Sequence, residues 1–160
     1  MKLIVKTFEE FTPAELYELL KCRIGVFVVE QNCPYQELDD LDYRSVHVYY
    51  LDDAGKIAAY LRLFEKDPAS HTVQMGRVLS VQRGTGLGGR ILREGMHVAM
   101  ERLQARTICI EAQQYAVGFY EREGFRPCSD VFLEDGIPHV KMEWQAPSHQ
   151  ASCKEESHHA

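Results

Sequence analysis

The sequence contains no apolar run that approaches the roughly 20 residues of a membrane-spanning helix, so it predicts no membrane partner. It contains no internal repeat either. The five cysteines are odd in number and lack C-x-x-C spacing, which argues against a disulfide framework or a zinc site and favours reduced thiols in a cytosol. Met1 is followed at once by strand-like sequence, which predicts no signal peptide and a cytoplasmic location.

Positive charge is also scarce. Lysine and arginine total 18 against 24 aspartates and glutamates, and the formal net charge is −6. This balance argues against nucleic acid or an anionic membrane as the main partner, so an anionic ligand must be held by local groups such as Arg83, Arg90 and Arg93. With 160 residues and 45% apolar side chains, the chain suffices for one domain whose core needs no disulfides.

Glycine, in contrast, is concentrated in one stretch. Gly84, Gly86, Gly88 and Gly89 connect a predicted strand over residues 72–81 to a predicted helix over residues 87–103. Such a turn exposes backbone N–H groups at the positive end of a helix dipole, and this arrangement binds phosphate. Because each glycine costs backbone entropy on folding, the run predicts a structural or ligand-binding reason.

Three interpretations of this stretch compete. Residues 84–89 fit the dinucleotide fingerprint G-x-G-x-x-G, with Glu111 near the position of the ribose-binding acid. Read together with Arg83, they form R-G-x-G-x-G, which resembles the acetyl-CoA pyrophosphate loop of the GNAT N-acetyltransferases. The third interpretation is a glycine-rich connection that binds nothing.

The rest of the chain predicts elements in the order β-α-loop-β-β-β-α-β-α-β-β. A strand over residues 2–7 precedes a helix that begins at the capping box of Thr12 and Glu15, with an apolar stripe as far as Phe27. Residues 30–44 are polar and aperiodic, which predicts an ordered loop. The sequence further predicts strands over 45–51, 57–64, 72–81 and 107–112, a helix over 116–123, and a hairpin from 131–133 and 138–144. We expect one domain over residues 1–145 and a disordered tail over residues 146–160.

This order argues against the dinucleotide interpretation. A dinucleotide-binding domain carries its fingerprint after the first strand of several parallel βαβ units. Here three strands precede the glycines, two of them a predicted hairpin. A nicotinamide-dependent dehydrogenase is therefore a distant third hypothesis.

Longer strings strengthen the resemblance to GNAT and point to its ElaA-like branch. The resemblance spans residues 2–144, and its most specific parts are VFVVEQNCPY, beginning at Val26, and EDGIPH, beginning at Glu134. The connection between Arg77 and Arg83 is shorter than is usual in the family. The other matching residues are Arg23, Glu37, Asp39, Asp42, His47, Arg62, Gly76, Arg77, Val78, Glu111, Ala112, Gln113, Phe119, Tyr120, Gly124 and Phe125.

The resemblance implies an α/β (α+β) GNAT fold, in which a mixed central sheet splays open between its fourth and fifth strands and carries helices on both faces. Acetyl-CoA would bind as cosubstrate in the gap between these two strands, and the reaction would use no metal. The backbone of the fourth strand would pair with the pantetheine, and the glycine loop would hold the pyrophosphate. The expected cofactor-binding residues are Leu79, Val81, Arg83, Gly84, Thr85, Gly86, Leu87, Gly88, Gly89 and Phe119.

The implied reaction is attack of a primary amine on the thioester. A free alkyl amine has a pKa near 10.4, so a base or a water chain must remove a proton before the attack. Glu111 and Glu30 are the candidate bases. Glu111 ends an apparently buried strand where desolvation would raise its pKa, although it could equally pair with Arg77. Tyr120 matches the family's usual acid for the departing thiolate, and its alternative is an ordinary core tyrosine.

The acceptor is expected to be a small-molecule or peptide amine, and the protein a monomer or homodimer. Five acids in and before the polar loop would make the acceptor mouth acidic and favour a cationic amine, unless they are merely a solvated or capping set: Glu30, Glu37, Asp39, Asp40 and Asp42. Asp39, Asp40, Asp42 and His47 fit no metal-binding spacing. A CoA-binding GNAT-like module without turnover is the alternative function.

Overall fold

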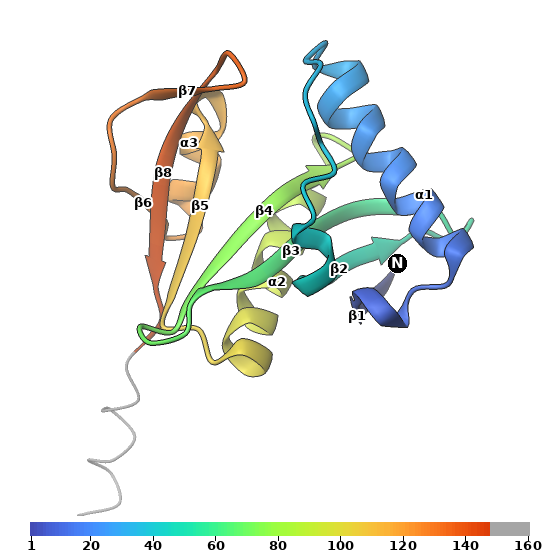
Figure 1. Ribbon diagram of the computed structural model, residues 1–160, viewed down its shortest axis with the longest axis horizontal. Coiled ribbons are helices and arrows are strands. Elements are labelled where there is room, and N and C mark those ends of the chain that lie inside the picture. Colours follow the sequence, from blue (N-terminus) through green and yellow to red (C-terminus); the bar gives the residue numbers. More distant parts are fainter. Residues whose placement is uncertain (148–160) are drawn as a thin grey trace, which may run out of the picture.

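The computed structural model describes residues 1–147, and its strands pair into an eight-stranded sheet (Figure 1). The strand order is β1-β2-β3-β4-β5-β8-β6, with β7 also paired to β8. The strand bounds are β1 Lys2–Thr7, β2 Val46–Leu51, β3 Ile57–Asp67, β4 Thr72–Ser80, β5 Thr107–Gln113, β6 Arg126–Pro127, β7 Phe132–Glu134 and β8 Ile137–Gln145.

Helices cover both faces of the sheet, as predicted. The α-helices are α1 Pro13–Ile24, α2 Leu87–Leu103 and α3 Val117–Arg122. Shorter turns precede or connect them: η1 Phe8–Glu10, η2 Gly25–Glu30, η3 Leu41–Arg44 and η4 Gln114–Ala116. Helix α1 lies on one face of the sheet, and α2 and α3 lie on the other (Figure 1).

The first helix begins as its capping box predicts. The Thr12 Oγ1 accepts the Glu15 N–H at 3.2 Å, and the Glu15 carboxylate accepts the Thr12 N–H at 2.9 Å. The α-helix ends at Ile24, however, and the apolar stripe continues through the π-helical turn η2. The wider turn carries Val26 and Phe27 to the sheet, so the predicted stripe is correct and its uniform α-helical geometry is wrong.

The sheet splays between β4 and β5, which confirms the expected architecture. These strands form the parallel pair of the described sheet, and their pairing ends after Gln74 and Cys109. Beyond that point β4 continues beside β3, and β5 continues beside β8 (Figure 1). The two halves of the sheet therefore diverge and leave the end of β5 facing β4 across a gap that side chains line.

Each face of the sheet packs apolar side chains against the helices that cover it. Helix α2 packs against β3 so closely that a Cβ at Gly95 would lie 2.5 Å from the Leu61 Cδ2. On the opposite face Leu19 of α1 packs with Tyr49, Tyr60 and Leu79. The larger cluster, on the α2 and α3 side, includes Leu61, Leu63, Met75, Ile91, Leu92, Ile108, Phe125 and Met142.

Parts of the chain differ from the sequence expectations or lie outside the described residues. Strand β6 was not predicted, because two residues carry no detectable alternation. Strand β5 is not buried along its whole length: Ile108, Cys109 and Ile110 are buried, but Glu111 is exposed. The expected disordered tail lies almost entirely outside the described residues. Within the part of the chain that the structure describes, no helix combines the length and apolarity needed to cross a membrane.

Candidate active site

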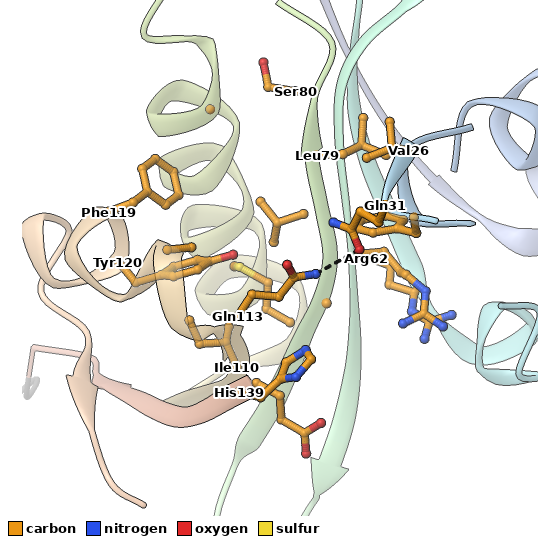
Figure 2. Close-up of a pocket in the computed structure, with 18 of the residues that line it drawn as sticks. Val26, Gln31, Arg62, Leu79, Ser80, Ile110, Gln113, Phe119, Tyr120 and His139 are labelled. Atoms are coloured by element: carbon orange, nitrogen blue, oxygen red, sulfur yellow. Dashed lines mark hydrogen bonds between the residues drawn. The ribbon is translucent and has the colours of Figure 1, made fainter. Parts of the chain in front are cut away.

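A cleft of about 980 Å³ occupies the splay of the sheet (Figure 2). One wall comes from η2 and the loop that follows it, and the floor comes from β4. The opposite wall comes from β5, α3 and the β7–β8 hairpin. The glycine loop closes one end. Segments that are widely separated in the sequence therefore share one cavity, and this cavity is the candidate active site.

The glycine loop adopts the conformation that its sequence predicts. Gly84 and Gly86 have φ values of +78° and +77°, in the left-handed region that favours glycine, and Gly86 caps the N-terminus of α2. A Cβ at either position would meet no atom within 4 Å, so the backbone conformation rather than crowding requires glycine there. The first N–H groups of α2 have no intrahelical acceptor and point toward the loop, as an anion site requires.

Most of the predicted cofactor residues line this cleft, and three do not. Leu79, Arg83, Gly84, Gly86, Gly88, Gly89 and Phe119 are among the lining residues. The Phe119 ring lies 3.6 Å from the position of a Cβ at Gly88, so it forms a wall next to the loop. Leu87 is buried in the core, Thr85 hydrogen-bonds to the Gln82 carbonyl, and Val81 is exposed.

The expected role of Val81 is wrong. Its N–H donates to the Ala58 carbonyl at 2.8 Å, so this group is used within the sheet. Backbone groups alternate between the two edges of a strand, so those of Leu79, which pairs with Tyr60, also face β3. The free edge of β4 therefore presents Val78 and Ser80. The residues whose backbone faces the cleft are therefore shifted by one position from those expected. The shift arises at Arg77, where a bulge interrupts the register between Gly76 and Leu79.

Tyr120 lies where the wall formed by α3 meets the cleft. Its ring is buried and packs edge-on against Phe119 and Phe125. Figure 2 shows its hydroxyl directed into the cleft, and within residues 1–147 that hydroxyl has no hydrogen-bond partner. Burial, followed by the nearby Tyr115, raises the pKa of Tyr120 above its ordinary value, so the phenol stays protonated at neutral pH.

The two candidate bases occupy unexpected positions. Glu111 lines the cleft but is exposed rather than desolvated, and it does not pair with Arg77, which contacts Glu37 and Asp39 instead. Glu30 lies outside the main cleft and forms an ion pair with Arg83 of the glycine loop. Desolvation and then the charge of Glu111 raise the pKa of Glu134, which lies on β7, above its ordinary value.

The expected acidic mouth is also wrong, because four of its five acids pair with arginines: Glu30 with Arg83, and Glu37, Asp39 and Asp42 with Arg23, Arg62 and Arg77. Arg23, fully buried, bonds Glu37 at 2.8 Å and Asp42 at 2.6 Å. Arg62 bonds Asp39 at 2.8 Å, and Arg77 bonds Glu37 at 2.8 Å. All three arginines stand in the family-like strings, but their spacing in the sequence does not reveal their partners.

This arginine–carboxylate network favours the ionised form of Asp42. Burial opposes the ionisation of Asp42 most strongly, but the hydrogen bond from Arg23 and the charges of Arg23 and Arg62 together lower the pKa of Asp42. His47 lies beside the network, with its two ring nitrogens bonded to the Tyr60 hydroxyl at 2.7 Å and the Asp42 carbonyl at 3.0 Å. No group of side chains within residues 1–147 could hold a metal ion.

Two polar contacts and one lining residue of the cleft were not predicted. The Gln113 amide donates to the Gln31 amide at 3.1 Å and connects the two walls (Figure 2). The Cys33 thiol, buried in the loop, donates to the Asp135 carbonyl at 3.5 Å, which fits the role of a small packing residue. His139 on β8 also lines the cleft, and the sequence offered only its place in the EDGIPH string as a signal.

Comparison with known proteins agrees with this architecture. Residues 14–146 match the family described as acetyltransferase (GNAT) domain. A UPF0039 protein of Schizosaccharomyces pombe is 35% identical over 145 residues, which cover 89% of this chain and 95% of that protein. The ElaA protein of Escherichia coli is 34% identical over 136 residues, covering 83% of this chain and 89% of ElaA.

Solved structures show the same likeness. The crystal structure of Escherichia coli ElaA superposes with a TM-score of 0.83, covering 90% of this chain and 99% of that one. An acyl-CoA N-acyltransferase from Pseudomonas aeruginosa superposes with a TM-score of 0.81 at 36% identity, with the same coverage. The chain therefore belongs to the GNAT acetyltransferase family, in its ElaA-like branch.

Proposed function

We propose that this protein transfers an acetyl group from acetyl-CoA to a primary amine by direct attack of the amine on the thioester. The observation that carries the proposal is the Tyr120 hydroxyl, which belongs to a buried ring, stays protonated at neutral pH and faces the cleft without a hydrogen-bond partner among residues 1–147. A protonated hydroxyl that faces the cleft and is not used by another protein group is available to donate its proton to a leaving group.

The cofactor half of the site consists of the glycine loop and the free edge of β4. The N–H groups at the start of α2, together with Arg83, would hold the pyrophosphate, because a diphosphate needs several converging donors. Val78 and Ser80 would pair with the pantetheine as an added strand does. The Pseudomonas aeruginosa relative is named for action on acyl-CoA, which supports this assignment at 36% identity.

The reaction then balances as follows. The bound ammonium loses one proton to a base, and the neutral amine attacks the carbonyl carbon to form the C–N bond. When the C–S bond breaks, Tyr120 donates its proton to the departing thiolate. The amide nitrogen loses its second proton, which restores the tyrosine directly or through water. Acid catalysis of this kind contributes about 10² to 10⁴ in rate.

Two measurements on the intact protein test the proposal. Calorimetry should show binding of acetyl-CoA and CoA but not of NAD, and release of free thiol should follow when primary amines are added. Binding of acetyl-CoA with no thiol release from any amine would instead favour a CoA-binding module without turnover. Binding of NAD with no affinity for CoA would favour the dehydrogenase.

A further inference from the structure

The face of β5, β7 and β8 that lines the cleft carries a histidine between two carboxylates. His139 stands opposite Gln113 on β5 and opposite Phe132 on β7, and residues directly opposite each other share a face of the sheet. Because side chains alternate along a strand, Glu111 and Glu134 lie on that same face. All three of these titratable side chains line the cleft.

The tautomer of His139 is fixed by its hydrogen bond. His139 is 8% exposed, and its Nδ1 lies 2.7 Å from the Ile137 carbonyl oxygen. A carbonyl oxygen only accepts, so Nδ1 carries the proton and the neutral ring has its lone pair on Nε2. Within residues 1–147 the nearest charged partner of Nε2 is a Glu134 oxygen at 3.7 Å, beyond hydrogen-bond distance. The basic nitrogen of a buried ring is therefore free beside the cleft.

The two carboxylates lack a cation to balance them. Among the described residues Glu111 forms no ion pair, and the one ion-pair partner of Glu134 is His139. Lys141 stands opposite Glu111 across the strands, but its ammonium lies 5.8 Å over the Phe132 ring. Because the Glu111 charge hinders ionisation of Glu134, a cation placed between the two carboxylates would relieve their repulsion.

We propose that Glu111, Glu134 and His139 form the acceptor half of the active site, where the carboxylates hold a cationic primary amine and His139 takes its proton. This rests on the proposed acetyl transfer. The ammonium N–H bond breaks as the Nε2–H bond forms, which leaves a neutral amine for attack and an imidazolium that later loses its proton to water. The substrate class is an alkyl amine that carries no carboxylate near the reacting nitrogen, and a second ammonium group improves its binding.

The substrate class is tested with three amines of similar length: 1,4-diaminobutane, butylamine and 4-aminobutanoate. We expect kcat/KM to fall in that order for the unmodified protein, because the acid pair attracts the second ammonium and repels the carboxylate. Glu134→Gln should raise KM for 1,4-diaminobutane more than for butylamine. Equal use of 4-aminobutanoate and 1,4-diaminobutane would overturn the assignment of the carboxylates.

The base is tested with His139→Asn, since the Asn amide still donates to the Ile137 carbonyl while no basic nitrogen remains. kcat should fall by about 10² to 10⁴, and the acidic limb of the kcat/KM profile should disappear. The limb should persist in Glu134→Gln, which separates His139 from its neighbours. The other titratable groups around the ring are Glu111 on β5, Glu134 and Asp135 at the β7–β8 turn, Lys141 on β8 and Cys33 in the facing loop.

Controls distinguish the possible failures. His97→Asn, on the exposed face of α2, should keep the parental kinetics. Acetyl-CoA affinity within twofold of the parent shows that His139→Asn is folded, and His139→Gln is the second variant if it is not. Parental kcat and an unchanged pH limb in a folded variant would overturn the role of His139. If the unmodified protein releases thiol with other primary amines but with none of these three, this inference fails and the proposed acetyl transfer stands, whereas no release with any amine would overturn both.

Discussion

Glu30 and Arg83 form an ion pair across the entrance of the cleft, although they are 53 positions apart in the sequence. Glu30 ends the π-helical turn on the acceptor side, and Arg83 begins the glycine loop on the cofactor side. A phosphate that approached Arg83 would compete with this carboxylate. The pair thus connects the two halves of the proposed site.

Glu30→Gln should raise the affinity for CoA. Exposed ion pairs contribute about 0 to 1 kcal/mol, so releasing Arg83 should strengthen binding by up to about fivefold. Calorimetry with CoA measures the change, and Glu9→Gln, on the distant turn η1, serves as the control. Weaker binding in Glu30→Gln would mean that the pair holds the loop in its binding conformation.

Gly86→Glu should abolish most CoA binding, because it puts bulk and negative charge against the proposed pyrophosphate site. Gly55→Glu is a matched control: its φ of +75° is nearly the same as the +77° of Gly86, and both positions are uncrowded. Both variants should lose similar stability, and Gly55→Glu should bind CoA normally. Unchanged affinity in folded Gly86→Glu would exclude the phosphate loop.

Tyr120→Phe should lower the single-turnover rate of acetyl transfer by about 10² to 10⁴, because it removes the acid and keeps the ring that packs against Phe125. CoA affinity should stay the same. Tyr115→Phe, altered at a side chain that is 82% exposed, should have a mild effect. A parental rate in Tyr120→Phe would assign the proton to water or another group.

Below about pH 6.5, the free energy of unfolding should decrease as the pH is lowered, because of His47. Burial lowers its pKa in the folded state, so the unfolded chain binds the proton more readily. Stability is therefore complete above the unfolded pKa and declines by up to about 1.4 kcal/mol per pH unit as the pH falls from 6.5 toward the lower folded pKa. Urea denaturation between pH 7 and pH 5 measures this slope.

Two variants show whether His47 causes this pH dependence of stability. His47→Gln should flatten the slope, whatever its effect on stability at pH 7. His97→Gln, at the exposed pair with Glu101, should retain it. A slope that survives in His47→Gln would assign the titration to another group.

Glu37→Gln should destabilise the protein by about 3 to 5 kcal/mol, because it removes the buried carboxylate charge that pairs with the buried Arg23 and the partly exposed Arg77. Thermal and urea unfolding measure the loss. Glu101→Gln, at an exposed pair, should cost less than about 1 kcal/mol. A small loss at Glu37 would show that the arginines find other partners.

The sequence by itself determined the features that depend on neighbouring residues. The Thr12–Glu15 capping box starts α1, Gly84 and Gly86 form the turn before α2, and the hairpins are close to their predicted positions. The long family-like strings also predicted the splay between β4 and β5. Side-chain periodicity and turn chemistry act over a few positions, so a linear pattern records them.

Only the tertiary structure decided which polar side chains meet. Glu37, Asp39 and Asp42, expected to belong to an open acidic mouth, are paired with Arg23, Arg62 and Arg77. A bulge at Arg77 turns the backbone groups of Val78 and Ser80, rather than those of Leu79 and Val81, toward the cleft. His139 gained its place beside Glu134 and Glu111 from the register of three strands. A shift of one residue reverses the face that a side chain occupies, and no spacing in the sequence fixes that register between distant segments.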